Sequence, residues 1–180
     1  MQPSGAGKAV SVRRATDADI AFIMASERLP AYERMVGRWS EERHRASLAS
    51  PDFAYLIGLD GEGRAAGFAI LRDLQNPADN IGLQRIVAAE AASGFGRPFL
   101  AAVCDWVFAE TACNRLCLEV FTDNARARHV YRSLGFVEEG LLREVAKRRD
   151  GTRADQILMS VLRREWADRS PGGSGLTTSP

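Results

Sequence analysis

The spacing of apolar and polar residues changes along the chain, and the changes predict a series of strands and helices. Residues 10–14 alternate as a strand does. Residues 16–19, Thr-Asp-Ala-Asp, then offer a helix cap and acidic side chains for a first turn. We therefore expect a helix that runs to about Glu27, with an inward face made by Ile20, Ile23 and Met24.

The next segments predict the first half of a sheet. Residues 29–39 have no regular pattern, and residues 40–50 predict a second short helix. Residues 53–59 and 64–74 are rich in β-forming side chains and are joined by Asp-Gly-Glu-Gly, which is typical of a hairpin. Residues 80–88 form a third run of the same kind.

The second half alternates helices with strands. Residues 94–112 predict a helix, residues 115–121 a short apolar strand, and residues 124–134 a helix that a glycine ends. Residues 136–146 and 156–162 predict a last hairpin around an Asp-Gly pair. The first of these helices has a broad apolar face made by Phe99, Leu100, Val103, Trp106 and Val107.

This element order predicts an α+β fold. We expect a mixed, mostly antiparallel sheet of six to seven strands with about four helices around it. A chain of 180 residues with 46% apolar composition is long enough for one buried core and short for two. Residues 9–166 are expected to form a single domain, and residues 1–8 and 167–180 flexible termini, because Gly, Ser and Pro dominate there.

Charge and composition exclude several classes of function. Lys and Arg number 24 and Asp and Glu 23, so the bulk charge does not favour nucleic acid or a membrane surface as a partner. No stretch has the apolar length of a signal peptide or a membrane-spanning helix, so we expect a cytoplasmic protein. Three cysteines without Cys-x-x-Cys spacing and two histidines predict neither a disulfide framework nor a metal site.

A glycine-rich segment indicates a phosphate site. Ser93-Gly94-Phe95-Gly96-Arg97 stands at the start of the longest helix, shortly after Arg85-Ile86-Val87 in the third β-rich run. Glycines let a ligand approach the backbone closely, and a helix start has free N–H groups with positive dipole character. The spacing favours a pyrophosphate site, although an ordinary strand-to-helix turn has the same pattern. No Gly-Lys-Ser/Thr follows, which disfavours a nucleoside triphosphate site.

A second motif identifies a family. Residues 118–136 read LEVFTDNARARHVYRSLGF. This stretch resembles the final motif of the GNAT N-acetyltransferase superfamily, a strand ending in Leu-Glu-Val followed by Asn, Ala, Tyr and Gly-Phe. With the glycine-rich segment the resemblance covers residues 85–136. The Asp150-Gly151 hairpin, with Asp155, Met159 and Glu165-Trp166, resembles the branch that includes ribosomal-protein N-terminal acetyltransferases and polyamine acetyltransferases.

The resemblance implies acetyl-CoA as co-substrate and assigns roles to particular residues. The strand residues Arg85, Ile86 and Val87 would present backbone groups to the pantetheine arm and thioester. Residues 93–97 would hold the pyrophosphate, and Asn124 would contact the cofactor arm. Tyr131 would protonate the departing thiolate, and Glu119 would draw a proton from the amine, directly or through water.

One departure from the family pattern concerns the glycine-rich loop. The residue three positions before Gly94 is usually Arg or Gln in this family, and here it is Ala91. The change removes a side-chain contact to phosphate but keeps the backbone N–H groups. We expect acetyl-CoA binding to survive, weakened by about 1 to 2 kcal/mol.

The residues themselves leave alternatives open. Tyr131 lies on the inward side of its helix and is equally explained as a core tyrosine. Glu119 is explained either as a base or as the ion-pair partner of Arg115 or Arg85. The basic run 147–149 is either an attraction for an acidic acceptor or a solvated hairpin. Tyr32, Met35 and Trp39 are explained either as the wall of an acceptor site or as plain packing.

Two functions remain at this point. The first is an enzyme that transfers acetyl from acetyl-CoA to a primary amine by direct attack, with a protein N-terminus, a polyamine, an amino acid or another small amine as acceptor. The second is a non-catalytic acyl-CoA-binding sensor or interaction module. Direct attack needs no nucleophilic cysteine, and both Glu119 and Tyr131 favour the enzyme. Assembly as a homodimer stays open.

Overall fold

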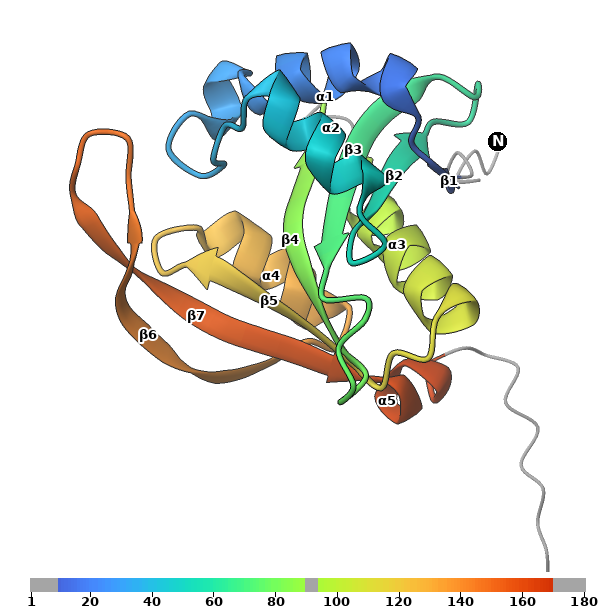
Figure 1. The fold of residues 1–180 in the computed structure, drawn as a ribbon. Helices are drawn as coiled ribbons and strands as arrows, with labels where there is room; N and C mark the ends of the chain where they lie inside the picture. Colours follow the sequence, from blue (N-terminus) through green and yellow to red (C-terminus); the bar gives the residue numbers. More distant parts are fainter. Residues whose placement is uncertain (1–9, 90–93, 170–180) are drawn as a thin grey trace, which may run out of the picture.

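The computed structural model describes residues 10–89 and 94–169 and shows one α+β fold (Figure 1). Seven strands and five α-helices are joined by short turns, and 3₁₀ turns cover Asp17–Asp19 and Pro30–Tyr32. The strands are β1 (Ser11–Arg14), β2 (Ala54–Leu59), β3 (Ala65–Arg72), β4 (Asn80–Ala88), β5 (Arg115–Phe121), β6 (Val137–Lys147) and β7 (Arg153–Leu162). The helices are α1 (Ile20–Glu27), α2 (Glu41–Ala49), α3 (Gly96–Glu110), α4 (Ala125–Ser133) and α5 (Arg163–Ala167).

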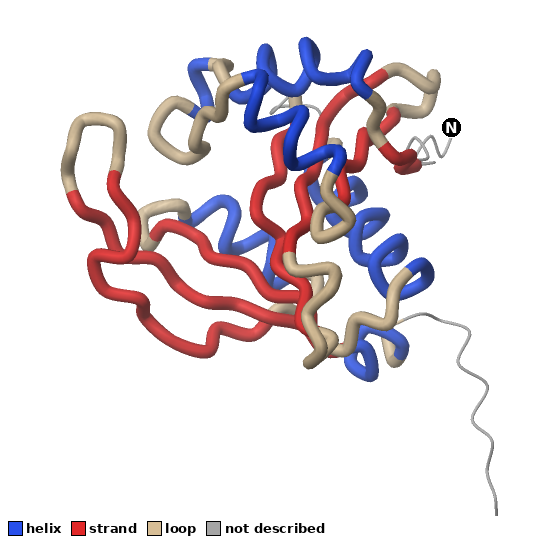
Figure 2. Tube along the Cα trace, viewed as in Figure 1, coloured by secondary structure: helices blue, strands red, loops and turns tan. Residues whose placement is uncertain are grey.

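The strands form a single sheet in the order β1-β2-β3-β4-β5-β7-β6. Every neighbouring pair is antiparallel except β4 and β5, which are parallel and connected through α3. The mostly antiparallel sheet predicted from the sequence is confirmed. The strand that returns beside β5 is β7, so β6 lies at the edge of the sheet (Figure 2).

Helices cover both faces of the central strands, which explains their continuous apolar sequences. Leu56 and Ala69 pack in the core cluster that includes the apolar face of α3. Tyr55, Ile57 and Phe68 pack in a second cluster with Ile23 of α1. A strand buried on both faces has no polar side to alternate with, so β2 and β3 read as unbroken apolar runs.

Local signals determined most helix ends. The Ser40 hydroxyl accepts from the Arg43 N–H at 3.2 Å and caps α2, and Gly135 ends the α4 region with φ of +84°. The first helix begins with a 3₁₀ turn, because Thr16 and Asp19 form a capping box there. The sequence did not predict α5.

The parallel pair β4–β5 is short, and the two strands separate beyond it. Only residues 80–82 of β4 pair with β5, at residues 115–117. The register of β4 against β3 shifts between Arg85 and Leu83, which leaves Gln84 as an exposed bulged residue. A bulge bends its strand and increases the local twist, so β4 continues along β3 while β5 continues along β7 (Figure 1).

Two general features of the described residues bear on function. No helix within residues 10–89 and 94–169 is long and apolar enough to cross a membrane. Over the same residues, no group of three or more His, Cys, Asp or Glu side chains is placed to hold a metal ion.

Candidate functional site

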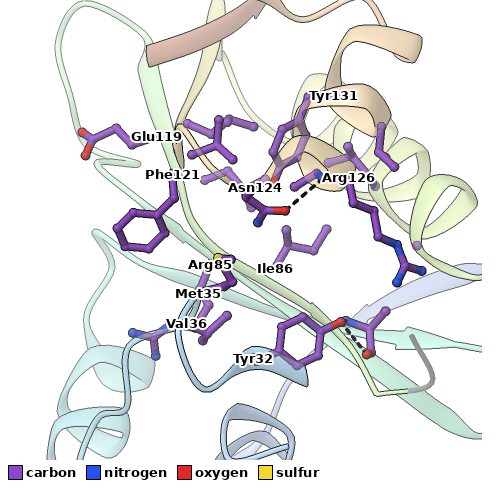
Figure 3. Close-up of a pocket in the computed structure, with 18 of the residues that line it drawn as sticks. Tyr32, Met35, Val36, Arg85, Ile86, Glu119, Phe121, Asn124, Arg126 and Tyr131 are labelled. Atoms are coloured by element: carbon purple, nitrogen blue, oxygen red, sulfur yellow. Dashed lines mark hydrogen bonds between the residues drawn. The ribbon is translucent and has the colours of Figure 1, made fainter. Parts of the chain in front are cut away.

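A cavity of about 560 Å³ lies where β4 and β5 separate. Its walls come from the loop after α1, from β4, β5 and α4, from the start of α3, and from Lys147 and Gln156 at the ends of β6 and β7. Figure 3 shows Phe121 and Glu119 at one end of the cavity and Arg126 at the other. The structure thus brings both motifs predicted from the sequence into one cleft.

The backbone of β4 offers hydrogen-bonding groups to this cavity. On its other side β4 pairs with β3, and the Ala89 N–H donates to the Ala66 carbonyl at 2.7 Å. Because backbone groups in an antiparallel strand alternate in direction, those of Ile86 and Ala88 face the side from which β5 has separated. The Tyr32 hydroxyl donates to the Ala88 carbonyl at 2.8 Å and accepts from the Ala88 N–H at 3.1 Å. Within the described chain, no strand residue pairs with Ile86 on that side.

The start of α3 forms another wall and leaves open space around its glycines. Gly94 has φ of +74°, a conformation that favours glycine, and a Cβ added at Gly94 or Gly96 would meet no atom within 4 Å. Arg97 donates from Nε to the Ser133 hydroxyl at 3.1 Å, which links α3 to the end of α4. Ser93 and Ala91 lie outside the described residues.

Two of the predicted cofactor residues present no side chain to the cavity. Phe95 is 7% exposed, and its ring stacks on Phe99 with centroids 5.1 Å apart. These rings pack onto the sheet, where a Cβ added at Gly58 would lie 2.5 Å from Phe99. Val87 is buried on the opposite face of the sheet, with α1.

Asn124 and Tyr131 stand on α4, as the motif predicted, and both line the cavity. The Asn124 side chain accepts from the Ala127 N–H at 3.1 Å, so it caps the helix. The Tyr131 ring is half-buried against Phe136, with centroids 5.8 Å apart. Burial is the main cause that raises the pKa of Tyr131, and the nearby Tyr32 and Cys104 raise it further. The hydroxyl therefore stays protonated at neutral pH.

Glu119 lies at the end of the cavity away from Arg126 (Figure 3), on the face of β5 opposite the buried Leu118 and Val120. Its side chain is 36% exposed, and Arg72 lies 3.9 Å away. Figure 3 shows the Glu119 carboxylate directed away from Tyr131. A carboxylate in this position is open to solvent and to an arriving amine.

Neither arginine suggested by the sequence pairs with Glu119. Arg115 forms an ion pair with Glu139. Arg85 forms a buried ion pair with Glu27, whose side chain is fully buried at the end of α1. The structure corrects the sequence here, because the folded chain brings each arginine into contact with another carboxylate.

The Arg85–Glu27 pair belongs to a larger buried polar network beside the cavity. Glu27 Oε1 also lies 3.3 Å from Nε2 of His44, and Nδ1 of His44 lies 3.2 Å from the Tyr55 hydroxyl. The Trp39 ring stacks 4.7 Å from the Arg85 guanidinium. This network joins α1, α2 and β4 and supports the loop that walls the cavity.

Sequence reasoning missed several residues that line the cavity. Three of them are Gln84, Phe121 and Gln156. Nothing in the sequence indicated that these side chains line the cavity, because each lies on a strand, and the neighbouring elements decide which face of that strand is turned toward the cavity. Lys147 lines the cavity as well, and the basic run that contains it was the only sequence indication of its position. Of the three residues predicted as a possible wall of the acceptor site, Tyr32 and Met35 line the cavity, whereas the Trp39 ring lies against Arg85.

The sequence and the structure were compared with known proteins. The sequence matches a family model described as the acetyltransferase (GNAT) family over residues 22–136. A spermidine N-acetyltransferase from Vibrio cholerae in complex with CoA and spermine has a TM-score of 0.79, at 20% identity, covering 88% of this chain and 98% of that one. A chimera of the Vibrio cholerae enzyme SpeG and hSSAT has a TM-score of 0.80, at 23% identity, covering 89% and 99%. Both solved structures share this fold.

Proposed function

The chain belongs to the GNAT family of acetyltransferases, and we propose that its cleft transfers an acetyl group from acetyl-CoA to a primary amine through Tyr131 and Glu119. The observation that carries this assignment of residues is that one cavity collects the glycine helix start, the free edge of β4, Tyr131 and Glu119. The roles of these residues and the amine acceptor are what we propose.

The cleft fits acetyl-CoA on its own features. The open space at Gly94 and Gly96 lies before the N–H groups of a helix start, which suits a pyrophosphate. The unpaired backbone groups of Ile86 suit the amides of a pantetheine arm. We propose that these residues, with Asn124, hold the co-substrate. When bound, acetyl-CoA supplies an activated acetyl thioester whose sulfur must gain a proton.

Tyr131 is proposed as the donor of that proton. Its raised pKa keeps the hydroxyl protonated, and within the described chain no residue forms a hydrogen bond with it. A protonated hydroxyl that is not already engaged is free to hydrogen-bond a sulfur in the cavity. The resemblance to the family motif gives Tyr131 the same role.

Glu119 is proposed as the acceptor of the amine proton, directly or through water. An amine is an ammonium ion at neutral pH and must lose a proton before its nitrogen attacks a carbonyl carbon. The partly exposed Glu119 carboxylate lies at the cavity end away from Arg126 (Figure 3). During transfer the new C–N bond forms as the C–S bond breaks, the nitrogen gives up one proton and the sulfur takes one.

The experiment that tests this function measures release of free thiol from acetyl-CoA with a panel of primary amines. We expect amine-dependent thiol release together with an acetylated product of matching mass. A chain that binds acetyl-CoA but releases no thiol with any amine would be the sensor. The sensor is not favoured, because it has no need of both a proton donor and a carboxylate in the same cavity.

Two finer statements about partners also remain proposals. A polyamine acceptor is one candidate, because the solved neighbour was captured with spermine. Assembly of several copies, with the homodimer as the smallest case, is another, since one spermidine N-acetyltransferase from Vibrio cholerae is described as dodecameric. Light scattering on the purified chain tests its assembly. The charges that line the cleft bear on the choice of a polyamine as acceptor.

A further inference from the structure

Among residues 10–89 and 94–169, Glu119 is the one acidic side chain that lines the cavity. Arg72, 3.9 Å away, already offsets part of its negative charge. A substrate with several ammonium groups therefore meets one partly compensated carboxylate here.

The hairpin beside this end is cationic. Residues 147–153 contain four basic side chains and one acid, Asp150. Lys147 lines the cavity, and no residue in the described ranges forms an ion pair or hydrogen bond with its side chain. Its ammonium group is available to a ligand.

Arg148 adds a buried hydrogen-bond donor that the described chain leaves unsatisfied. Its guanidinium lies 4.5 Å from the centre of the Phe121 ring, which lines the cavity, and Nη2 contacts Asp123 at 2.7 Å. The side chain is 9% exposed, and its Nη1 atom is buried without a hydrogen-bond partner in the described chain. A buried guanidinium nitrogen without a partner favours an anion nearby.

The loop on the opposite wall has the same sign of charge. Residues 33–38 contain two arginines, Arg34 and Arg38, against Glu33. Met35 and Val36 of this loop line the same cavity as Lys147 of the hairpin. The acceptor end therefore lies between two cationic segments.

From this distribution we infer that the acceptor is a primary amine that also carries a carboxylate, and not a polyamine. The inference rests on the proposed acetyl transfer at the same site. The ammonium of such an acceptor meets Glu119, its apolar chain lies along Met35 and Phe121, and its carboxylate meets Lys147. A second ammonium in place of the carboxylate would meet a cation, and like charges disfavour binding.

Three amines of equal chain length test the charge at the far end. These are 4-aminobutanoate, n-butylamine and 1,4-diaminobutane, whose far ends are anionic, neutral and cationic. Spermidine is the fourth arm. The tetrapeptides Ser-Glu-Glu-Ala and Ser-Lys-Lys-Ala form a further pair, which distinguishes a free amino acid from a peptide as the source of the carboxylate. Thiol release with each amine gives kcat/KM.

We expect kcat/KM to fall in the order anionic, neutral, cationic, with roughly tenfold or more between the ends of the series. Raising the salt concentration should narrow this range, because exposed charges are screened. The substitution Lys147→Glu should lower kcat/KM for 4-aminobutanoate and raise it for 1,4-diaminobutane. Arg164→Glu makes the same charge change on the exposed α5, remote from the hairpin (Figure 1), and should leave the order unchanged.

Each outcome decides between the proposals. A cationic or neutral amine acetylated fastest would overturn the inference and leave acetyl transfer intact. So would values of kcat/KM for 4-aminobutanoate and 1,4-diaminobutane that Lys147→Glu does not change. Binding of acetyl-CoA without thiol release from any arm overturns the acceptor inference and the catalytic proposal together. Loss of acetyl-CoA binding itself would count against the proposed site and not against the acceptor class alone.

Discussion

The Tyr32 hydroxyl holds both backbone groups of Ala88, donating to its carbonyl at 2.8 Å and accepting from its N–H at 3.1 Å. One side chain thus joins the loop after α1 to the end of β4, across 56 positions of sequence. The bond closes one wall of the cavity beside the edge of β4 that Ile86 leaves unpaired.

Replacing Tyr32 with Phe should loosen this wall. The two backbone groups of Ala88 then lose their partner, so we expect the free energy of unfolding to fall by about 1 to 2 kcal/mol. The KM for the amine should rise more than kcat falls, because the loop positions the acceptor and does no chemistry. Urea unfolding and steady-state kinetics measure these effects, and unchanged stability and KM would show that the contact has no such role.

Replacing Tyr131 with Phe should separate chemistry from folding. The hydroxyl has no hydrogen-bond partner among residues 10–89 and 94–169, so its loss should change the free energy of unfolding by less than about 1 kcal/mol. We expect kcat to fall by about 10- to 100-fold, at the low end of acid–base contributions, with the affinity for acetyl-CoA unchanged. Equal turnover of the variant and the parent at every pH would remove Tyr131 from the mechanism.

Replacing Glu119 with Gln should affect turnover and leave the fold intact. Its closest described cation, Arg72, lies 3.9 Å away and both side chains are partly exposed, so little stability depends on the pair. We expect kcat to fall by about 10²- to 10⁴-fold at neutral pH, with partial recovery at high pH as solvent deprotonates the amine. The pH profile of kcat is the measurement. A destabilised variant with full activity would show a structural ion pair instead.

Replacing Gly96 with Glu tests the co-substrate site. The added side chain meets no protein atom within 4 Å at its Cβ, so the variant should fold, while its bulk and charge enter the space proposed for the pyrophosphate. Acetyl-CoA should raise the melting temperature of the parent and not of the variant. Gly140→Glu, at an equally open glycine of β6, is the matched control and should keep the shift. Similar shifts in all three proteins would place acetyl-CoA elsewhere.

Alkaline pH should destabilise the fold. Burial raises the pKa of Tyr131, Tyr55 and Cys113 above the ordinary values of 10.0 for tyrosine and 9.0 for cysteine. The unfolded chain therefore releases these protons first as pH rises, so the stability that they contribute is present below pH 9 and is lost above it. Urea unfolding at pH 7, 9 and 10.5 should show this decline, and Tyr131→Phe should reduce it. A free energy of unfolding that stays level across this range would contradict the prediction.

The order of helices and strands could be predicted because it depends on short-range patterns. The strand β4 covers residues 80–88 in the prediction and in the structure alike, since its β-rich run has clear ends. The two motifs also predicted that Gly94, Asn124 and Tyr131 line one cleft, and all three do. This was possible because glycines and helix-cap residues are required by the local backbone conformation at their own positions. The strand limits and these three cleft residues could be predicted because the local sequence is itself their physical cause.

Contacts between residues far apart in the sequence decided the features of the site that the short-range patterns did not predict. The bulge at Gln84 depends on the register between β3 and β4, and the Arg85–Glu27 pair joins residues 58 positions apart. The partner of a charged residue is set by which carboxylate the folded chain brings near it, and so Arg85 turned out to serve a buried network and not Glu119. The sequence by itself determined the family and the elements of the cleft, whereas the tertiary structure alone decided which charges face its acceptor end, because strand register and loop contacts orient them.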